Sequence, residues 1–186
     1  LDTALDGEGE RMVAAGDLAP VFKGARVVAA EYRVGLALHA AIEPICATAM
    51  WEDGVVRLWL PTQAPGFARD AVAEVLGIGA SKVMIQPVLA GGSFGQNLEH
   101  QVAAQAALIA REVKKPVQLM WSRGETCVQD RFRPPAAGRM TARLGSNGSI
   151  SGWLAKIAAP RTGHELARRL AGGGGGIDDV VTRRVG

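Results

Sequence analysis

A glycine-rich segment in the middle of the chain is the first place where the residue types suggest chemistry. Residues 91–95 read Gly-Gly-Ser-Phe-Gly, between an apolar run that predicts a strand and an alanine-rich run that predicts a helix. Glycines let a backbone approach a ligand closely, and the free N–H groups at a helix start attract anions. The segment has neither the ending of a P-loop nor the spacing of the dinucleotide fingerprint. By itself it indicates either an anion site or a structural tight turn.

A second candidate is the polar end of the run Trp59-Leu60-Pro61-Thr62-Gln63, which precedes an expected helix. Ligands often bind at loops that lead from a strand into a helix. The Gln63 carboxamide offers one acceptor oxygen and two N–H donors, so it could bind an oxo group, a water or a pterin edge. The alternative is that Thr62 or Gln63 only caps the helix, and the residues alone favour that simpler interpretation.

His39 and Glu43 form a third candidate, four residues apart and just before Pro44. Two ligands are too few for a metal site, and His100 and His164 show no matching spacing. We therefore expect His39 and Glu43 to make structural hydrogen bonds, and we predict no metal-ligating residue.

Composition excludes several classes of protein. The 186 residues are 48% hydrophobic and 21% charged, which is typical of a globular chain and not of a disordered one. Cys46 and Cys127 are the only cysteines, too few for a disulfide-stapled fold, an iron–sulfur cluster or a four-cysteine zinc site. No apolar stretch is long enough for a transmembrane helix. The acidic first ten residues do not resemble a signal peptide, and the chain starts with Leu.

The hydrophobic pattern predicts an α+β fold, a two-layer sandwich with a mixed or antiparallel sheet and helices on one face. Residues 1–24 are expected to be a loosely ordered lead-in, residues 25–160 the folded domain, and residues 161–186 a flexible Gly-rich tail. The expected strands are 25–34, 46–52, 55–60, 82–89, 117–121, 138–144 and 149–158; the expected helices are 66–76, 97–113 and a turn within 122–130. Asp53-Gly54 predicts a type I′ hairpin turn, and Gly77 a helix C-cap.

Five segments, taken in order, resemble one family. They are His39-Ala40-Ala41-Ile42-Glu43-Pro44, Trp59-Leu60-Pro61-Thr62-Gln63, Gly91-Gly92-Ser93-Phe94-Gly95, Pro116-Val117-Gln118-Leu119-Met120-Trp121-Ser122-Arg123 and Asp130-Arg131-Phe132-Arg133-Pro134. The chain resembles, from about Ala25 to Ala158, the molybdopterin-binding large subunit of the xanthine oxidase/aldehyde oxidase family, of the isoquinoline 1-oxidoreductase beta-subunit type. Residues 25–160 would then be the first half of that family's cofactor-binding region.

The resemblance implies a molybdenum–pterin cofactor (molybdopterin), often extended to a cytosine dinucleotide form, with no protein thiolate on the metal. It implies oxidative hydroxylation of an aldehyde or N-heterocycle, with water as the oxygen source. The residues expected to bind the cofactor are Gln63, Gly91, Gly92, Ser93, Phe94 and Gly95. The expected partners are the remainder of the large subunit and a small iron–sulfur subunit. The compartment stays open between the cytoplasm and the periplasm.

Some features depart from the family pattern. Ser93 replaces a usual third glycine, which requires a negative φ at that position, and Gln96-Asn97 replaces two basic residues common in this subtype. None of Glu99, Glu112, Glu125 and Glu165 matches the motif of the family's general-base glutamate. We therefore assign no catalytic residue, and we expect the isolated chain to be inactive.

An alternative function rests on charge. Residues 1–110 have a net charge of −5 and residues 111–186 a net charge of +8. The chain could therefore be a non-catalytic interaction domain whose basic C-terminal half binds an acidic partner. We expect no nucleic-acid partner, because the sequence contains no recognition motif for nucleic acid.

Overall fold

The computed structural model describes residues 1–24 and 26–170. These residues form two compact units. Within the described ranges, unit 1 combines residues 1–37 with residues 133–169, and unit 2 consists of residues 38–132 with Leu170. The domain boundaries predicted after residues 24 and 160 stay a prediction. Most of the predicted Gly-rich tail, residues 171–186, lies outside the described residues.

Unit 2 is built on a mixed four-stranded sheet with the order β4-β3-β2-β5. Its strands are β2 (Cys46–Glu52), β3 (Val55–Leu60), β4 (Val83–Pro87) and β5 (Val117–Met120). The β2–β3 hairpin turns at Asp53 and Gly54 with φ angles of 49° and 78°, which confirms the predicted type I′ turn. Strands β3 and β4 are parallel, so they need the crossover that α3 (Pro65–Leu76) supplies.

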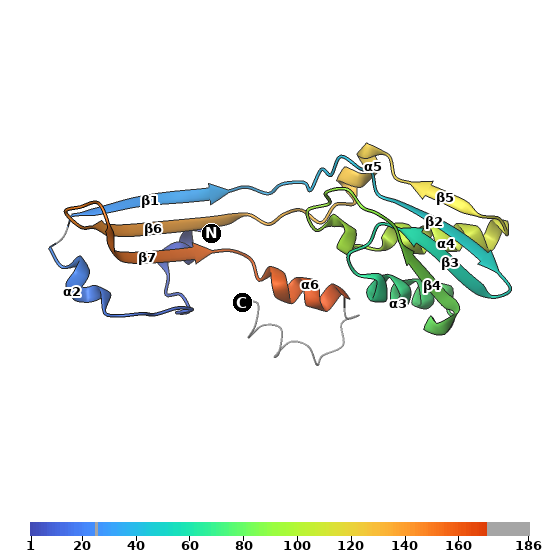
Figure 1. Cartoon of the computed structure of the whole chain (residues 1–186), viewed down its shortest axis with the longest axis horizontal. Coiled ribbons are helices and arrows are strands. Elements are labelled where there is room, and N and C mark those ends of the chain that lie inside the picture. The colour runs from blue at the N-terminus through green and yellow to red at the C-terminus, as the bar shows by residue number, and fades with distance from the viewer. Residues whose placement is uncertain (25, 171–186) are drawn as a thin grey trace. The chain divides into compact units, whose positions relative to one another are not determined.

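Helices α3 and α4 (Gln101–Val113) cover one face of this sheet (Figure 1). Gly77 ends α3 in the left-handed conformation with a φ of 65°, so the predicted C-cap is confirmed. The small side chains of α4 let the helix lie close to the sheet, because an alanine adds only one methyl group between the two backbones. The fully buried ones are Ala103, Ala106, Ala107 and Ala110, and they pack in one cluster with Ala47, Ala49, Val56 and Leu58 of the sheet.

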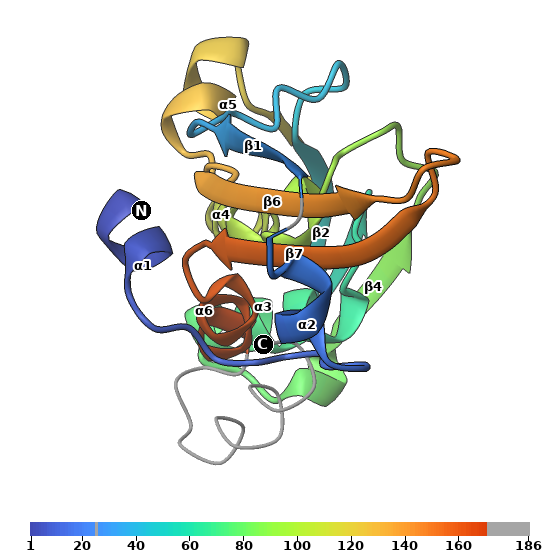
Figure 2. The same ribbon diagram turned by 90° about the vertical axis from the view of Figure 1, so that its left-hand side faces the viewer.

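Unit 1 contains an antiparallel sheet with the order β1-β6-β7. Its strands are β1 (Val27–Val34), β6 (Ala136–Leu144) and β7 (Ile150–Ala158). The predicted lead-in contributes two short helices, α1 (Asp2–Asp6) and α2 (Leu18–Phe22), which pack against β7 (Figure 2). A Cβ on Gly152 would lie 2.7 Å from Val21 Cγ1, so α2 approaches β7 as closely as it does only because residue 152 is glycine.

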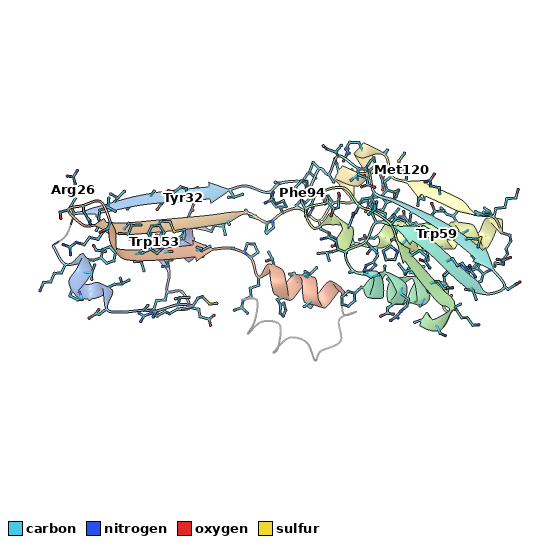
Figure 3. All side chains as sticks on the ribbon, viewed as in Figure 1. Arg26, Tyr32, Trp59, Phe94, Met120 and Trp153 are labelled. Carbon is cyan, nitrogen blue, oxygen red and sulfur yellow. The ribbon has the colours of Figure 1, made fainter. Side chains whose placement is uncertain are left out.

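The other face of this sheet is apolar and exposed. Val28 of β1 and Trp153 of β7 lie at the same position on either side of β6, and so do Tyr32 and Ile157. The four side chains therefore share one face of the sheet. Their exposed fractions lie between 51% and 67%. Figure 3 labels Tyr32 and Trp153 on this surface. The helix α6 (Thr162–Leu170) follows β7.

The α+β class, the mixed and antiparallel pairing and the helices on one face are confirmed. The hydrophobic pattern of the sequence did not show that the strands form two sheets. Periodicity reports which face of a strand is buried and not which strand pairs with it. Among the described residues, no helix combines the length and the apolar character needed to cross a membrane.

Candidate functional site

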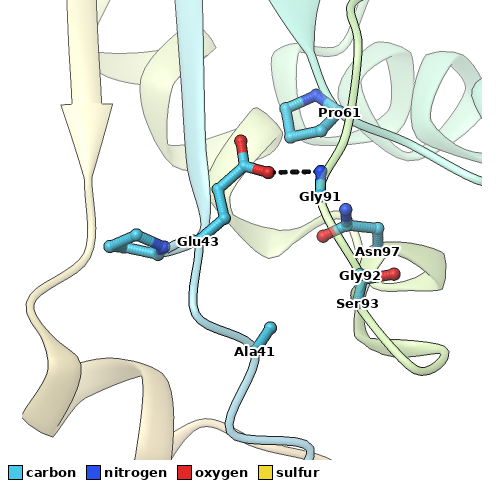
Figure 4. A pocket seen from close by; sticks show the side chains of 8 residues that line it. Ala41, Glu43, Pro61, Gly91, Gly92, Ser93 and Asn97 are labelled. Atoms are coloured by element: carbon cyan, nitrogen blue, oxygen red, sulfur yellow. Dashed lines mark hydrogen bonds between the residues drawn. The ribbon is translucent and has the colours of Figure 1, made fainter.

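Three of the predicted segments meet in unit 2 around a shallow depression (Figure 4). Residues 41, 43 and 44 form one side, and Gly91–Ser93 form the other. Pro61 and Asn97 complete the lining. The fold therefore brings together the His39–Pro44 segment, the end of β3 and the glycine-rich loop, which are far apart in the sequence.

Glu43 holds the start of the glycine-rich loop. Its Oε2 accepts a hydrogen bond from the Gly91 backbone N–H at 2.6 Å (Figure 4). A Cβ on Gly91 would lie 2.9 Å from the same oxygen. The carboxylate thus occupies the space that a side chain at residue 91 would need, so a larger residue would have to displace it.

Asp130 ties the end of the loop to the His39 segment. Its carboxylate accepts the His39 backbone N–H at 2.7 Å, contacts His39 Nδ1 at 2.7 Å and accepts Gln96 Nε2 at 3.3 Å. The Asp130 side chain is only 1% exposed. Burial of a carboxylate is costly unless its oxygens are hydrogen-bonded, and here three donors meet that demand. His39 and Glu43 do make hydrogen bonds, as predicted, but to different partners.

Sequence reasoning missed Asp130 and Gln96 as site residues. Asp130 could have been identified as a site residue because it lies in one of the five segments that resemble the family. Gln96 and Asn97 are both buried, at 2% and 9% exposure. Among the described residues, Gln96 Oε1 has no hydrogen-bond partner.

No group of three or more His, Cys, Asp or Glu side chains that could hold a metal occurs in the described ranges.

The backbone of the loop presents a row of free donors. Phe94 and Gly95 have positive φ angles of 55° and 105°. The turn closes through Gln96 N donating to Ser93 O at 2.9 Å and Leu98 N donating to Gly95 O at 3.1 Å. The N–H groups of residues 92–95 donate to no atom of the described chain. Successive free N–H groups in a turn of this kind form a concave site for an anion or a polarised oxygen.

The sequence suggested that the free N–H groups would belong to the start of a helix, but in the structure they belong to the loop. Helix α4 begins at Gln101, four residues later than predicted, after the 3-10 turn Gln96–Leu98. The expectation that the N-terminus of this helix directly follows the loop was therefore wrong. Phe94 is a non-glycine residue with a positive φ, which costs backbone energy and is found most often at functional sites, and its side chain is 68% exposed.

Gln63 and Ser93 face each other across the loop. Ser93 Oγ donates to Gln63 Oε1 at 3.0 Å. The alternative that Thr62 or Gln63 caps α3 is wrong: the N-cap position is Ala64, and no side chain caps this helix. Ser93 is not among the residues with positive φ, so the hydroxymethyl group meets the conformational condition set by its replacement of glycine.

Cys46 lies at the start of β2 as a free thiol. Its partial burial raises its pKa, and the negative charge of Glu43 raises it further. Only the thiolate reacts with an alkylating reagent, so Cys46 should react more slowly at neutral pH than an unperturbed thiol.

We expect Glu43→Gln to speed the alkylation of Cys46, because removing the negative charge lowers the cost of forming the thiolate. Iodoacetamide labelling at several pH values, resolved by peptide mass spectrometry, measures the rate at each cysteine. Cys127 in the same sample is the internal control. An unchanged or slower Cys46 rate in the variant contradicts the assignment of Glu43 as a cause of the raised pKa.

Comparisons with known proteins agree on one group of relatives. The family described as "Molybdopterin cofactor-binding domain" matches residues 5–163. The beta subunit of isoquinoline 1-oxidoreductase from Brevundimonas diminuta is 33% identical over 120 residues, which cover 64% of this chain and 15% of that protein. The large molybdopterin subunit of nicotinate dehydrogenase from Eubacterium barkeri is 32% identical over 122 residues, which cover 64% of this chain and 29% of that protein.

Solved structures show the same fold. Quinoline 2-oxidoreductase from Pseudomonas putida 86 matches 84% of this chain and 22% of that chain, with a TM-score of 0.62 and 24% identity. Aldehyde oxidoreductase from Desulfovibrio gigas matches 77% of this chain and 16% of that chain, with a TM-score of 0.63 and 20% identity. The chain thus spans a small part of the length of each protein it resembles.

Proposed function

Because the chain belongs to the molybdopterin cofactor-binding domain family, we propose that unit 2 forms one wall of the molybdenum–pterin site of a molybdenum hydroxylase. The observation that carries the proposal is that the N–H groups of residues 92–95 have no acceptor in the described chain, while Gly92 and Ser93 line the pocket and Ser93 contacts the Gln63 carboxamide. A side chain at residue 91 would meet the Glu43 carboxylate and one at residue 92 the Phe94 ring, so the two glycines let these groups pack against the loop.

The residues fit such a cofactor in the chemistry of their donors. Oxygen atoms of the cofactor need hydrogen-bond donors, and the loop offers N–H groups. The matched segment makes up only 15% of the length of the isoquinoline 1-oxidoreductase beta subunit and 29% of that of the nicotinate dehydrogenase subunit. We therefore expect other segments of the enzyme to supply the remaining walls. When bound, the molybdenum–pterin group supplies the oxidation–reduction chemistry.

The roles we propose for this chain are binding and orientation. The N–H groups of Gly92, Ser93, Phe94 and Gly95 donate to cofactor oxygens, and Gln63 donates from the side. The exposed Phe94 ring forms an apolar wall that keeps water from the site. Glu43 and Asp130 hold the two ends of the loop. Both carboxylates already accept hydrogen bonds from the chain, so we assign neither as a catalytic residue.

For the whole enzyme we propose oxidative hydroxylation of an aldehyde or an N-heterocycle, with water as the oxygen source. The support is that the relatives include isoquinoline 1-oxidoreductase, nicotinate dehydrogenase and an aldehyde oxidoreductase. Proposed partners are the remainder of a large subunit and a small iron–sulfur subunit. The exposed apolar face of β1-β6-β7 supports the first of these, because apolar surface of this kind favours burial.

The test is the metal and pterin content of the assembled enzyme. We expect the native polypeptide that contains this chain, purified with its partner subunit, to hold molybdenum and to release a fluorescent pterin after oxidation. A folded assembly that contains neither would falsify the proposal. The isolated 186-residue chain should oxidise no aldehyde or N-heterocycle, because the pocket it offers is only part of a site.

The alternative, a basic interaction domain, receives less support. Several basic side chains of the C-terminal half are paired with carboxylates of the same chain. Arg111 pairs with Glu112, Arg131 with Glu99, and Arg139 with Asp6 and Glu31. These pairs reduce the positive charge available to an acidic partner, so salt-dependent binding by this half is expected to be weak.

A further inference from the structure

We propose that helix α1 is a removable cover over a docking site for an acidic helical segment of another protein. The site lies on the face of the β1-β6-β7 sheet against which α1 packs. While α1 is docked it blocks the site, and its release lets a helix of similar chemistry take its place. The inference concerns unit 1 alone and is independent of the proposed cofactor site in unit 2.

Two neighbouring rows of paired residues form the floor of the site. From β1 through β6 to β7, the first row is Arg33, Ala137 and Ala158, and the second is Glu31, Arg139 and Lys156. Residues two positions apart on a strand point to the same face, so both rows lie on one face of the sheet. With three positive charges, one negative charge and two alanines, this floor is basic and contains a small apolar area.

Helix α1 fits this floor through one apolar and two acidic side chains. Leu5 is 1% exposed and packs in one cluster with Ala137 and Ala158. Leu5 and Asp6 follow Asp2 by three and four positions, so the three side chains share one face of the helix. The helix therefore presents an apolar anchor and two carboxylates to the sheet.

The charged contacts of α1 are open to solvent. Asp2 pairs with Arg33, and Asp6 pairs with Arg139 at 3.1 Å. The four side chains are between 41% and 69% exposed. Ion pairs this exposed stabilise a structure weakly and are screened by salt. The hold of these contacts on α1 should therefore weaken as the ionic strength rises.

Helix α1 can leave the sheet while the rest of unit 1 stays folded. It has five residues and no side-chain N-cap, whereas isolated helices shorter than about 12 residues are marginal in water, so α1 is helical only while it is docked. Residues 7–17 connect it to α2, which packs separately on β7 beside Gly152. Release of α1 is therefore a local opening that breaks few contacts.

Release of α1 changes the charge of the floor. Arg33 and Arg139 lose the carboxylates of α1. Lys156 loses the backbone oxygen of Gly7 to which it donates. Glu31 still pairs with both arginines, at 2.7 Å and 3.3 Å, so three positive charges remain beside one negative charge.

The floor selects for more than negative charge. A simple polyanion would pair with the exposed cations but would leave the two alanines in contact with water. A helix that carries a leucine between two carboxylates pairs with the cations and also covers the apolar area. The partner that fits is therefore an acidic helix with one aliphatic anchor, as α1 itself shows.

Alkylation of a buried thiol tests the release of α1. In the full chain, Leu5→Cys places a thiol where it reacts with iodoacetamide only when α1 opens, and peptide mass spectrometry resolves it from Cys46 and Cys127. Raising the salt concentration from about 0.1 M to about 1 M should speed this reaction by about two- to five-fold for each ion pair. Leu154→Cys is the control, because Leu154 lies on the same face of the sheet but is 52% exposed.

The charge of a single residue can be tested in the same way. Asp6→Asn combined with Leu5→Cys should raise the rate at low salt by about two- to five-fold and reduce the effect of salt. If the introduced thiol at residue 5 reacts as fast as the one at residue 154 at low salt, α1 is not docked and the proposal is wrong. Equal protection at low and high salt overturns the role of charge in holding the cover.

Binding of a peptide tests the docking site itself. The probe is a synthetic peptide with the sequence of residues 1–8, and nuclear magnetic resonance of the full chain follows the amides of Arg139 and Lys156. Leu5→Ser releases α1, so the peptide should shift these signals at a concentration at least about ten-fold lower than in the wild type, where α1 competes. Leu154→Ser is the matched control and should behave as the wild type does.

A second variant and two further probes complete the test. Asp2→Asn combined with Asp6→Asn keeps Leu5 and should bind the peptide with an affinity between those of the wild type and Leu5→Ser, whether or not Leu5→Ser disturbs the fold. A peptide with serine at its fifth position, and duplex DNA, should both bind the Leu5→Ser chain more weakly than the probe does. Equal peptide binding by the wild type and both variants, or no binding by any of them, overturns the docking site. DNA binding as tight as that of the peptide overturns the assignment of an acidic helix.

Discussion

Replacing Asp130 by alanine is expected to lower the free energy of unfolding of unit 2 by about 3 kcal/mol or more, because each of the three donors that lose their acceptor costs about 1–3 kcal/mol when it is left unsatisfied. The carboxylate is 1% exposed and accepts the His39 backbone N–H, the His39 ring and the Gln96 side chain. The variant leaves these donors buried with no acceptor, and each must lose hydrogen-bond energy or let water into the structure.

The measurement is urea unfolding followed by tryptophan fluorescence. Three of the four tryptophans, Trp51, Trp59 and Trp121, belong to unit 2, and only Trp153 belongs to unit 1. In a Trp153→Phe background, tryptophan fluorescence therefore reports the unfolding of unit 2 alone. The midpoint and slope of the unfolding transition can then be compared between variants.

Two matched variants separate the mechanism from a general loss of charge. Asp130→Asn keeps an acceptor oxygen for the His39 N–H, so it should cost about half as much as the alanine variant, in the range of one or two hydrogen bonds. Asp70→Ala removes an exposed carboxylate paired only with its neighbour Arg69, and it should cost less than about 0.5 kcal/mol. An Asp130→Ala protein within about 1 kcal/mol of the wild type would show that the three contacts do not stabilise the loop.

Gly95→Ala is expected to destabilise unit 2 by about 1–3 kcal/mol, because a φ of 105° is strained for any residue with a Cβ. Space does not prevent the substitution: a Cβ at residue 95 would lie 3.7 Å from His39 Nε2, an ordinary contact. Relief of the strain requires φ to change at the centre of the loop. That change would move the free N–H groups of the loop, so the assembled enzyme should also hold less cofactor.

Gly66→Ala is the control for Gly95→Ala. Gly66 lies in the first turn of α3 without a positive φ, and a Cβ there meets nothing within 4 Å. Alanine at that position should stabilise the protein by about 0.4–1 kcal/mol, because it restricts the unfolded chain. Urea unfolding in the same background measures both variants, and the two substitutions should change stability in opposite directions. Equal effects of the same sign would contradict the assignment of strain to residue 95.

Features that depend on neighbouring residues could be predicted. The hairpin at Asp53-Gly54 needed only two residues that tolerate positive φ. The C-cap at Gly77 and the close packing of α4 followed from a glycine after a helical run and from alanines at helical spacing. Each is decided within one or two turns of chain, where residue type and backbone energy are directly linked.

Features that join distant residues could not be predicted in the same way. The contact between His39 and Asp130 spans 91 positions, and that between Glu43 and Gly91 spans 48. Periodicity marked the residues near these positions as loops, but loops have no repeating pattern from which a partner can be derived. The five family-like segments marked the neighbourhood of the site and not the hydrogen bonds within it.

By itself, the sequence determined the α+β class, the turn at Asp53-Gly54, the C-cap at Gly77, and the family to which the chain belongs. Only the tertiary structure decided that the strands separate into two sheets and that α4 starts after the loop and not within it. It also decided that the N–H groups of residues 92–95 have no acceptor in the described chain while two carboxylates hold the loop ends. The physical reason is that residue types set local backbone preferences, whereas a binding surface depends on which distant groups satisfy each other's hydrogen bonds and which are left free.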